Sequence, residues 1–223
     1  MKVALATTLS LAAAAQAAVQ GFDISHYQPN VDFAAAKSAG ARFVIIKATE
    51  GTTYTDPSFS SHYTGATNAG LIRGGYHFAH PGSSTGAAQA DYFLAHGGGW
   101  SGDGITLPGM LDLESGSSGE CWGLSASQMV SWIKSFSDQY HSKTGRYPMI
   151  YTSPAWWQDC TGNSNAFAST NPLVLAHYSS SVGPIPGGWP YQTIWQNADS
   201  YAYGGDSDIF NGSEDRLRAL ATG

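Results

Sequence analysis

The sequence predicts an α/β fold in the form of an irregular TIM-like barrel. Two observations lead to this prediction: about eight short β-rich segments recur along the chain, and segments with helix signals separate the early ones. Strands that alternate with helices run parallel through right-handed crossovers, and eight of them can close into a barrel. No linker or low-complexity break divides residues 18–223, so we expect one domain there.

Residues 1–17 have the pattern of a secretory signal peptide. Lys2 precedes an apolar stretch, and the small-residue triplet Ala15-Gln16-Ala17 provides a cleavage site. The stretch is too short to span a hydrocarbon core, which needs about 20 residues. We therefore expect a secreted, extracellular protein that has no membrane span.

The predicted strands are short runs of apolar, β-branched and aromatic residues. They cover residues 21–24, 43–48, 74–79, 109–114, 148–151, 173–178, 192–196 and 208–210. In a barrel of this kind the active site lies at the carboxyl ends of the strands.

Helices are predicted for residues 32–39, 57–69, 86–96 and 125–143. A glycine follows each of the first three, which is a typical helix stop. The last is the strongest, since Met129, Trp132, Ile133 and Phe136 recur at helical spacing. Connections after Tyr151 are rich in Gly, Pro, Ser and Asn. We therefore expect helices mainly after the first five strands and irregular structure in the last third.

Composition limits the class of ligand. The net charge of −6 argues against nucleic acid, because phosphate binding requires a basic surface. Seven Trp, twelve Tyr and nine Phe in a weakly charged chain favour a neutral, ring-shaped ligand such as a sugar. Cys121 and Cys160 are the two cysteines, and in an oxidising compartment we expect them to form a disulfide.

The tripeptide Asp112-Leu113-Glu114 carries the clearest chemical signal. Residues i and i+2 of a strand point to the same face, so both carboxylates should project into the barrel while Leu111 and Leu113 face the helices. Two adjacent acids cannot both ionise freely, which leaves a proton donor beside an anion. Glycosidic cleavage needs that combination, although the alternative of a solvated surface loop exists for any Asp-x-Glu sequence.

Aromatic residues near the predicted strand ends could stack on sugar rings, namely Tyr76, Tyr151, Tyr178 and Trp195. The alternative for each is simple core filling. His77 and His80 lack a third ligand at a recognisable spacing, so we expect neither a metal nor another cofactor. Lys47 and Glu50 are interpreted as a structural ion pair. A chitinase-like Asp-x-x-Asp-x-Asp-x-Glu motif is excluded, because Leu107 and Met110 occupy its earlier acidic positions.

The sequence resembles the glycoside hydrolase family 25 lysozymes, the Ch-type muramidases, over nearly all of residues 18–223. Eight ordered segments carry the resemblance: Gly21-Phe22-Asp23-Ile24-Ser25 with Tyr27-Gln28, residues 43–51, Gly75-Tyr76-His77-Phe78, Asp112-Leu113-Glu114, Ile150-Tyr151-Thr152, Leu175-Ala176-His177-Tyr178, Ile194-Trp195-Gln196 and residues 206–212.

The resemblance implies five βα units followed by strands, and hydrolysis of the β-1,4 bond between N-acetylmuramic acid and N-acetylglucosamine in peptidoglycan. It also implies that Glu114 is the acid, Asp112 its partner, and Asp23 and Asp206 further members of the cluster, with Asp208 as the alternative to Asp206. Retention of configuration with help from the substrate's acetamido group is the favoured route. We expect the enzyme to act as a monomer. A non-catalytic sugar-binding module is the rival, and retention of all four acids argues against it.

Overall fold

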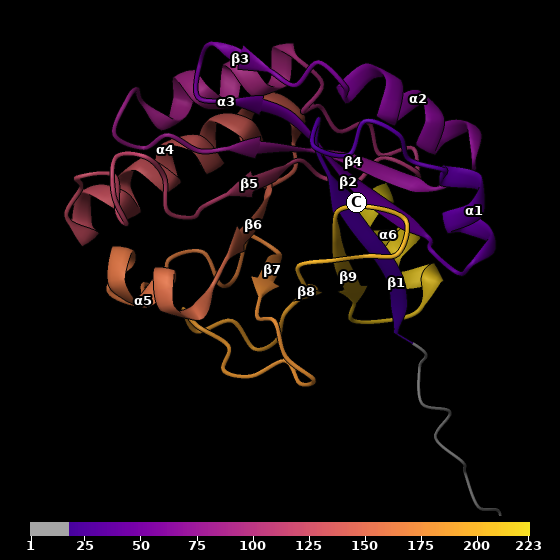
Figure 1. Cartoon of the computed structure of the whole chain (residues 1–223). Coiled ribbons are helices and arrows are strands. Elements are labelled where there is room, and N and C mark those ends of the chain that lie inside the picture. Colours follow the sequence, from indigo (N-terminus) through magenta and orange to yellow (C-terminus); the bar gives the residue numbers. More distant parts are fainter. Residues whose placement is uncertain (1–17) are drawn as a thin grey trace, which may run out of the picture.

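Eight strands close into a barrel in the computed structural model, which describes residues 18–223 (Figure 1). The barrel strands are β1 (Val19–Ile24), β2 (Phe43–Glu50), β4 (Ile72–Phe78), β5 (Met110–Asp112), β6 (Met149–Thr152), β7 (Leu173–Ala176), β8 (Ile194–Ala198) and β9 (Asp206–Phe210). The two-residue strand β3 (Tyr54–Thr55) forms a short hairpin on the end of β2. The predicted signal peptide, residues 1–17, lies outside the described part.

Parallel pairing runs from β1 through β2, β4, β5, β6 and β7 to β8, as the alternating pattern predicts. The last strand breaks the rule: β9 is antiparallel to both of its neighbours, β8 and β1. This reversal lies in the last third of the chain, where the barrel was predicted to be irregular. Residues 199–205 join β8 to β9, and a connection this short can form a hairpin but not a crossover.

Six helices are present in the described chain: α1 (Phe33–Ser38), α2 (Phe59–Asn68), α3 (Gly86–Ala95), α4 (Ala126–Thr144), α5 (Pro154–Thr161) and α6 (Glu214–Thr222). The first four confirm the predicted helices to within two residues at each end. In α4 the four apolar residues at helical spacing are all buried, and Gly145 ends the helix with φ of 72°. Figure 1 shows α1 to α4 as an arc around one side of the barrel.

Two of these helices, α5 and α6, were not predicted. Each begins at a serine N-cap, Ser153 or Ser213, whose side chain accepts a hydrogen bond from the helix backbone. Pro154 at the first turn and Gly162 after the end were further signals for α5. The barrel therefore has five βα units, because α5 follows the fifth barrel strand. On the side of β7 to β9, loops cover the barrel instead (Figure 1).

The apolar core has an inner and an outer part. Alternate residues of the strands, for example Phe43, Ile45 and Met149, fill the barrel interior. Leu217 and Ala221 of α6 join this interior cluster and close the amino-terminal end of the barrel. Residues of opposite orientation pack under the helices in two outer clusters.

None of the helices in residues 18–223 is both long and apolar enough to cross a bilayer.

Candidate active site

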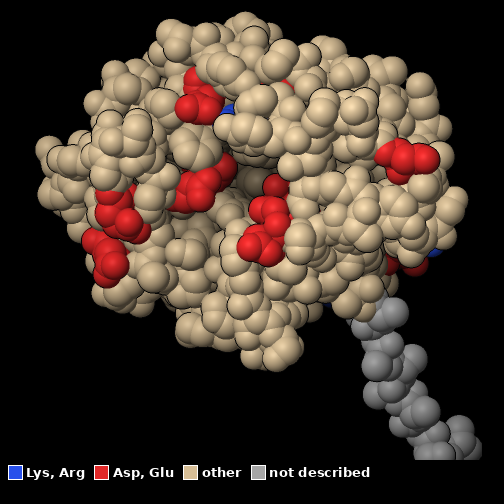
Figure 2. Space-filling view, in the orientation of Figure 1, with Lys and Arg blue, Asp and Glu red and all other residues tan. Residues whose placement is uncertain are grey.

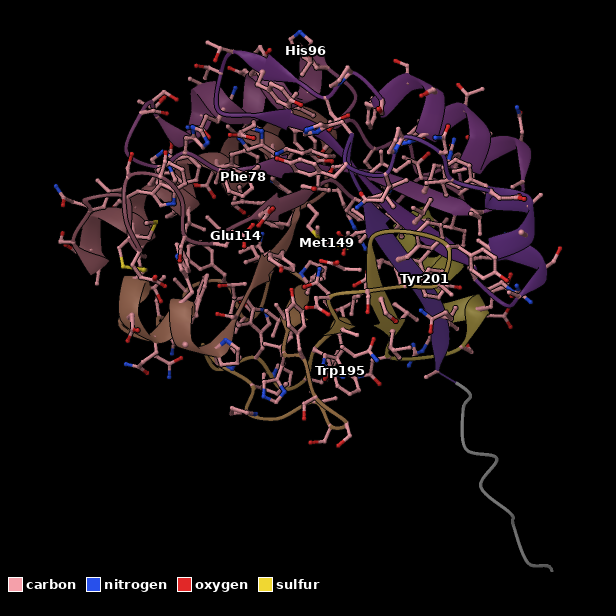
Figure 3. All side chains as sticks on the ribbon, in the orientation of Figure 1. Phe78, His96, Glu114, Met149, Trp195 and Tyr201 are labelled. Carbon is pink, nitrogen blue, oxygen red and sulfur yellow. A yellow bond between two sulfur atoms is a disulfide. The ribbon has the colours of Figure 1, made fainter. Side chains whose placement is uncertain are left out.

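The first pair of acids lies at the end of β5. Asp112 is the last residue of the strand and is 6% exposed. Met110, two residues earlier, lies in the barrel interior, whereas Leu111 and Leu113 pack in the outer core. Alternation therefore directs Asp112 inward, as predicted. Glu114 follows just beyond the strand and is exposed at the carboxyl end of the barrel (Figure 3).

A second pair of acids joins the first and last strands. Asp23 of β1 and Asp206 of β9 face each other as Cα partners in the antiparallel ladder. Gly205, which precedes Asp206, has φ of 70°, and a Cβ there would overlap the carbonyl oxygen of Asp23. A glycine is therefore required for the two strands to approach closely at this point.

Asp208 lies deeper on the same face of β9. Its side chain is 1% exposed, and no described residue donates a hydrogen bond to either carboxyl oxygen. Asp206 is partly exposed, so a ligand in the cleft can reach it more easily than Asp208. The carboxyl of Asp206 also accepts a hydrogen bond, from Gln196. The structure thus brings Asp23, Asp112, Glu114 and Asp206 to one end of the barrel.

Gln196 of β8 connects the acids to two of the predicted tyrosines. Its Nε2 donates to Asp23 Oδ2 at 2.7 Å and to Asp206 Oδ2 at 3.2 Å. Its Oε1 accepts from the hydroxyls of Tyr151, at 2.8 Å, and Tyr178, at 3.1 Å. Gln196 belongs to the Ile194-Trp195-Gln196 segment, but its place in the site was not predicted from the sequence.

Burial and mutual repulsion raise the pKa values of the acids. Burial, then the charge of Asp206, raises the pKa of Asp23 to about 8. Burial and the charge of Glu114 raise the pKa of Asp112 well above its usual range, and burial raises that of Glu114. The pKa values of Asp206 and Asp208 are also raised by burial. Asp23 therefore retains its proton at neutral pH, and raised pKa values of this kind suit a cluster of acids to general acid chemistry.

Lys47 of β2 opposes these shifts. Its positive charge lowers the pKa values of both Asp112 and Glu114. The ammonium nitrogen pairs with Glu50 at 2.7 Å and lies 4.8 Å from the centre of the Phe78 ring. Glu50 in turn contacts His80 Nε2 at 2.8 Å. The predicted ion pair is present, and it also places a cation near the acids.

Two pockets flank this cluster. One, of about 470 Å³, is lined by Glu114, Tyr151, Trp156 and Tyr178 together with short side chains. The other, of about 480 Å³, is lined by the Lys47, Glu50 and His80 group and by exposed hydroxyls. Figure 2 shows acidic side chains on both sides of a hollow in this face. A pocket of about 620 Å³ at the opposite end of the barrel has no carboxylate among its described lining residues.

The predicted aromatic residues divide into two groups. Tyr76 and Tyr151 point into the barrel, and Tyr178 is 55% exposed beside them. Trp195 does not join them, so its predicted place in the site is wrong. It alternates with the inward-facing Ile194 and Gln196, and its indole donates to the carbonyl of His177 at 2.7 Å. Figure 3 shows Trp195 far from Glu114.

The loop that follows Glu114 is fixed by a disulfide. Cys121 and Cys160 are bonded, which joins this loop to α5. The Trp122 indole donates to the carbonyl of Glu114 at 2.9 Å, and the Trp156 indole donates to Glu120 at 2.8 Å. The Trp122 bond fixes the backbone of Glu114, and the Trp156 bond fixes the same loop at the carbonyl of Glu120.

No group of three or more His, Cys, Asp or Glu side chains within residues 18–223 has an arrangement that could hold a metal ion.

Comparison with known proteins gives consistent matches. The sequence profile described as "Glycosyl hydrolases family 25" matches residues 22–206. An N,O-diacetylmuramidase from Chalaropsis sp. is 75% identical over 210 residues, which is 92% of this chain and 100% of that protein. An N,O-diacetylmuramidase from Arthroderma benhamiae is 64% identical and is covered completely, as is this chain.

Solved structures agree with the sequence matches. The muramidase from Trichobolus zukalii is 72% identical, covers 92% of this chain and 99% of its own, and has a TM-score of 0.91. A family GH25 lysozyme from Aspergillus fumigatus also has a TM-score of 0.91 at 61% identity, over 93% of this chain and 100% of that one.

Proposed function

The chain belongs to glycosyl hydrolase family 25 and is a lysozyme of the N-acetylmuramidase type that hydrolyses peptidoglycan, and we propose on this basis how its acids divide the chemistry. The observation that supports the proposal most directly is the grouping of Asp112, Glu114, Asp23 and Asp206 at one end of the barrel between two pockets. The bond cleaved is the β-1,4 link between N-acetylmuramic acid and N-acetylglucosamine.

Glu114 is the general acid in this proposal. It lines the tyrosine-containing pocket and is exposed, so its carboxyl can reach a glycosidic oxygen. Neighbouring groups still remove part of the water around the carboxyl, which raises its pKa. Its proton passes to the leaving oxygen as the bond to the anomeric carbon breaks. The same carboxylate then removes a proton from the water that completes hydrolysis, which regenerates the acid.

Asp112 supports the positive charge that develops at the sugar. We favour attack on the anomeric carbon by the carbonyl oxygen of the substrate's own acetamido group, with Asp112 holding the acetamido N–H. Water then opens the resulting cyclic ion, and configuration is retained. Lys47 favours the ionised form of Asp112 that this role requires.

The sugar rings are bound by Tyr76, Tyr151 and Tyr178. Each combines an apolar ring with a hydroxyl, and Tyr151 and Tyr178 line the same pocket as Glu114. Cleavage of muramic acid that carries an additional acetyl ester is also proposed, because the two sequence relatives are named N,O-diacetylmuramidases. Digestion of O-acetylated and de-O-acetylated peptidoglycan at equal rates would support this, and strong inhibition by the ester would contradict it.

The bond assignment is tested by digesting purified peptidoglycan and identifying the new reducing end. Muramic acid at that end supports the assignment, whereas glucosamine contradicts it. NMR of the first-formed anomer tests retention, since an inverting reaction yields the α-anomer from a β-linkage.

We further propose that the protein acts outside the cell as a monomer. The signal-like residues 1–17 and the disulfide support secretion. Light scattering of the purified enzyme tests the oligomeric state, and a stable dimer would contradict the proposal.

A further inference from the structure

Gln196 makes four hydrogen bonds at the centre of the acid cluster. Its side chain is buried at 3% exposure, and both amide hydrogens and both carbonyl lone pairs have partners. The amide satisfies this set with its nitrogen toward Asp23 and Asp206 and its oxygen toward the phenols. In this orientation an oxygen of each carboxyl that carries no proton accepts from Nε2, whether the carboxyl is ionised or protonated.

We propose that Gln196 is a positioning residue that sets the hydrogen-bond polarity of the whole site. This inference rests on the proposed roles of the acids and adds a positioning residue to them. Because Tyr151 and Tyr178 donate their hydroxyl hydrogens to Gln196, their remaining lone pairs can only accept. The two phenols therefore select ligand groups that donate, such as an acetamido N–H or a sugar hydroxyl.

Gln196 also keeps Asp23 and Asp206 together. These carboxylates come from the first and last strands of the barrel, and both bonds from Nε2 reach them from β8. The donated hydrogen bond favours the charged form of Asp23, against burial and the charge of Asp206. The titratable groups around this amide and its partners are Asp23, Asp112, Asp206, Asp208, Glu114, Tyr76, Tyr151 and Tyr178.

The experiment compares Gln196→Met with Gln196→Glu. Methionine keeps the approximate size and removes every hydrogen bond. Glutamate keeps the acceptor for the tyrosines, loses both donors and adds charge. For both variants we expect kcat/KM on peptidoglycan fragments to fall at least about tenfold. We also expect the acid limb of the pH profile to move to higher pH, further for Gln196→Glu than for Gln196→Met.

Gln89→Met is the matched control. Gln89 is likewise a fully buried glutamine with four hydrogen bonds, to His77, Ser84 and the backbone of His80, but it lies in the outer layer. Its loss should lower the melting temperature and leave the pH profile in place.

The inference is overturned if a folded Gln196→Met or Gln196→Glu enzyme keeps the wild-type pH profile, or if Gln89→Met moves that profile equally. If Gln196→Met fails to fold, the result with Gln196→Glu decides. Glu114→Gln is measured in parallel. High activity of that variant would contradict the proposed acid, whereas an unmoved profile in the Gln196 variants would contradict only the positioning role.

Discussion

Glu114 and Asp112 differ in their surroundings although only one residue separates them. Asp112 is enclosed in the barrel, whereas Glu114 lines an open pocket beside Tyr151 and Tyr178. Such a difference in environment allows two carboxyl groups to take different roles in one reaction.

Replacement of Glu114 by glutamine should abolish the proton transfer without altering the shape of the site. We expect turnover to fall by about 10²–10⁴ or more, because general acid catalysis contributes an effect of that size. The melting temperature should be unchanged or higher. Single-turnover assays on peptidoglycan fragments measure the effect, and turnover within tenfold of wild type would remove Glu114 from its role.

The acid cluster should make the fold less stable at neutral pH. The pKa of Asp23 is about 8 in the folded chain, against 3.8 for an unperturbed aspartate. The folded state therefore binds more protons between these values, so stability falls as pH rises from about 4 to 8. At pH 7 Asp23→Asn should stabilise the protein by about 1–4 kcal/mol, since one pKa unit corresponds to about 1.4 kcal/mol.

Thermal unfolding of the wild type and of Asp23→Asn at pH 4 and pH 7 tests this prediction. The gain in melting temperature should be larger at pH 7. An equal loss of stability at both pH values would show that the carboxyl is held by favourable contacts instead.

At the residue scale the sequence was most informative about the acids. Strand alternation predicted the inward direction of Asp112 correctly, because Leu111 and Leu113 are apolar and must face the helices. The same alternation rule could have excluded Trp195 from the active site, since Ile194 and Gln196 on either side of it face into the barrel. The contacts of Gln196 could not be predicted, because they join five strands or strand ends, and Asp23 and Tyr151 lie 173 and 45 residues from it in the chain.

At the scale of elements, the disulfide-linked loop after β5 supports the catalytic residue. Cys121→Ser with Cys160→Ser should cost about 3–4 kcal/mol of stability on the chain-entropy estimate for a separation of 39 residues. We also expect kcat to fall while the double variant is still folded, because the loop that the disulfide fixes includes Trp122, whose indole bonds the carbonyl of Glu114.

Assays at a temperature where the double variant is fully folded separate the two effects. Circular dichroism monitors folding, and a double variant with wild-type kcat would show that the loop needs no covalent support. Ser179→Ala with Ser181→Ala provides a control in another loop at the same end of the barrel.

The helices before Tyr151 were predicted, including the six-residue α1, whereas α5 and α6 in the last third of the chain were not. Burial of Met129, Trp132, Ile133 and Phe136 follows directly from their spacing in α4. By contrast, α5 has only eight residues, and the Gly- and Ser-rich composition around it suggested loops. The antiparallel direction of β9 depends on a seven-residue connection whose hairpin form requires tertiary contacts to be recognised.

For the molecule as a whole, the net charge of −6 affects the long-range electrostatic force between the enzyme and its substrate. Loss of Lys2 with the predicted signal peptide would make the charge one unit more negative. An acidic protein gains no long-range attraction to an anionic cell wall, so binding should depend on contacts in the cleft. We expect lytic activity to change little between about 20 and 150 mM salt, over which screening lengths shorten substantially. Turbidity assays of bacterial cells measure this, and a severalfold decline would indicate electrostatic steering.

The ladder between β1 and β9 also has a bearing on when the enzyme becomes active during synthesis. Asp23 is translated among the first residues of the fold and Asp206 among the last, yet they occupy facing positions. A ribosome-bound intermediate would hold Asp23 with neither its partner acid nor a sealed barrel. Hydrolysis should therefore begin only after β9 has emerged and docked on β1, which makes closure of the barrel the step that switches on catalysis.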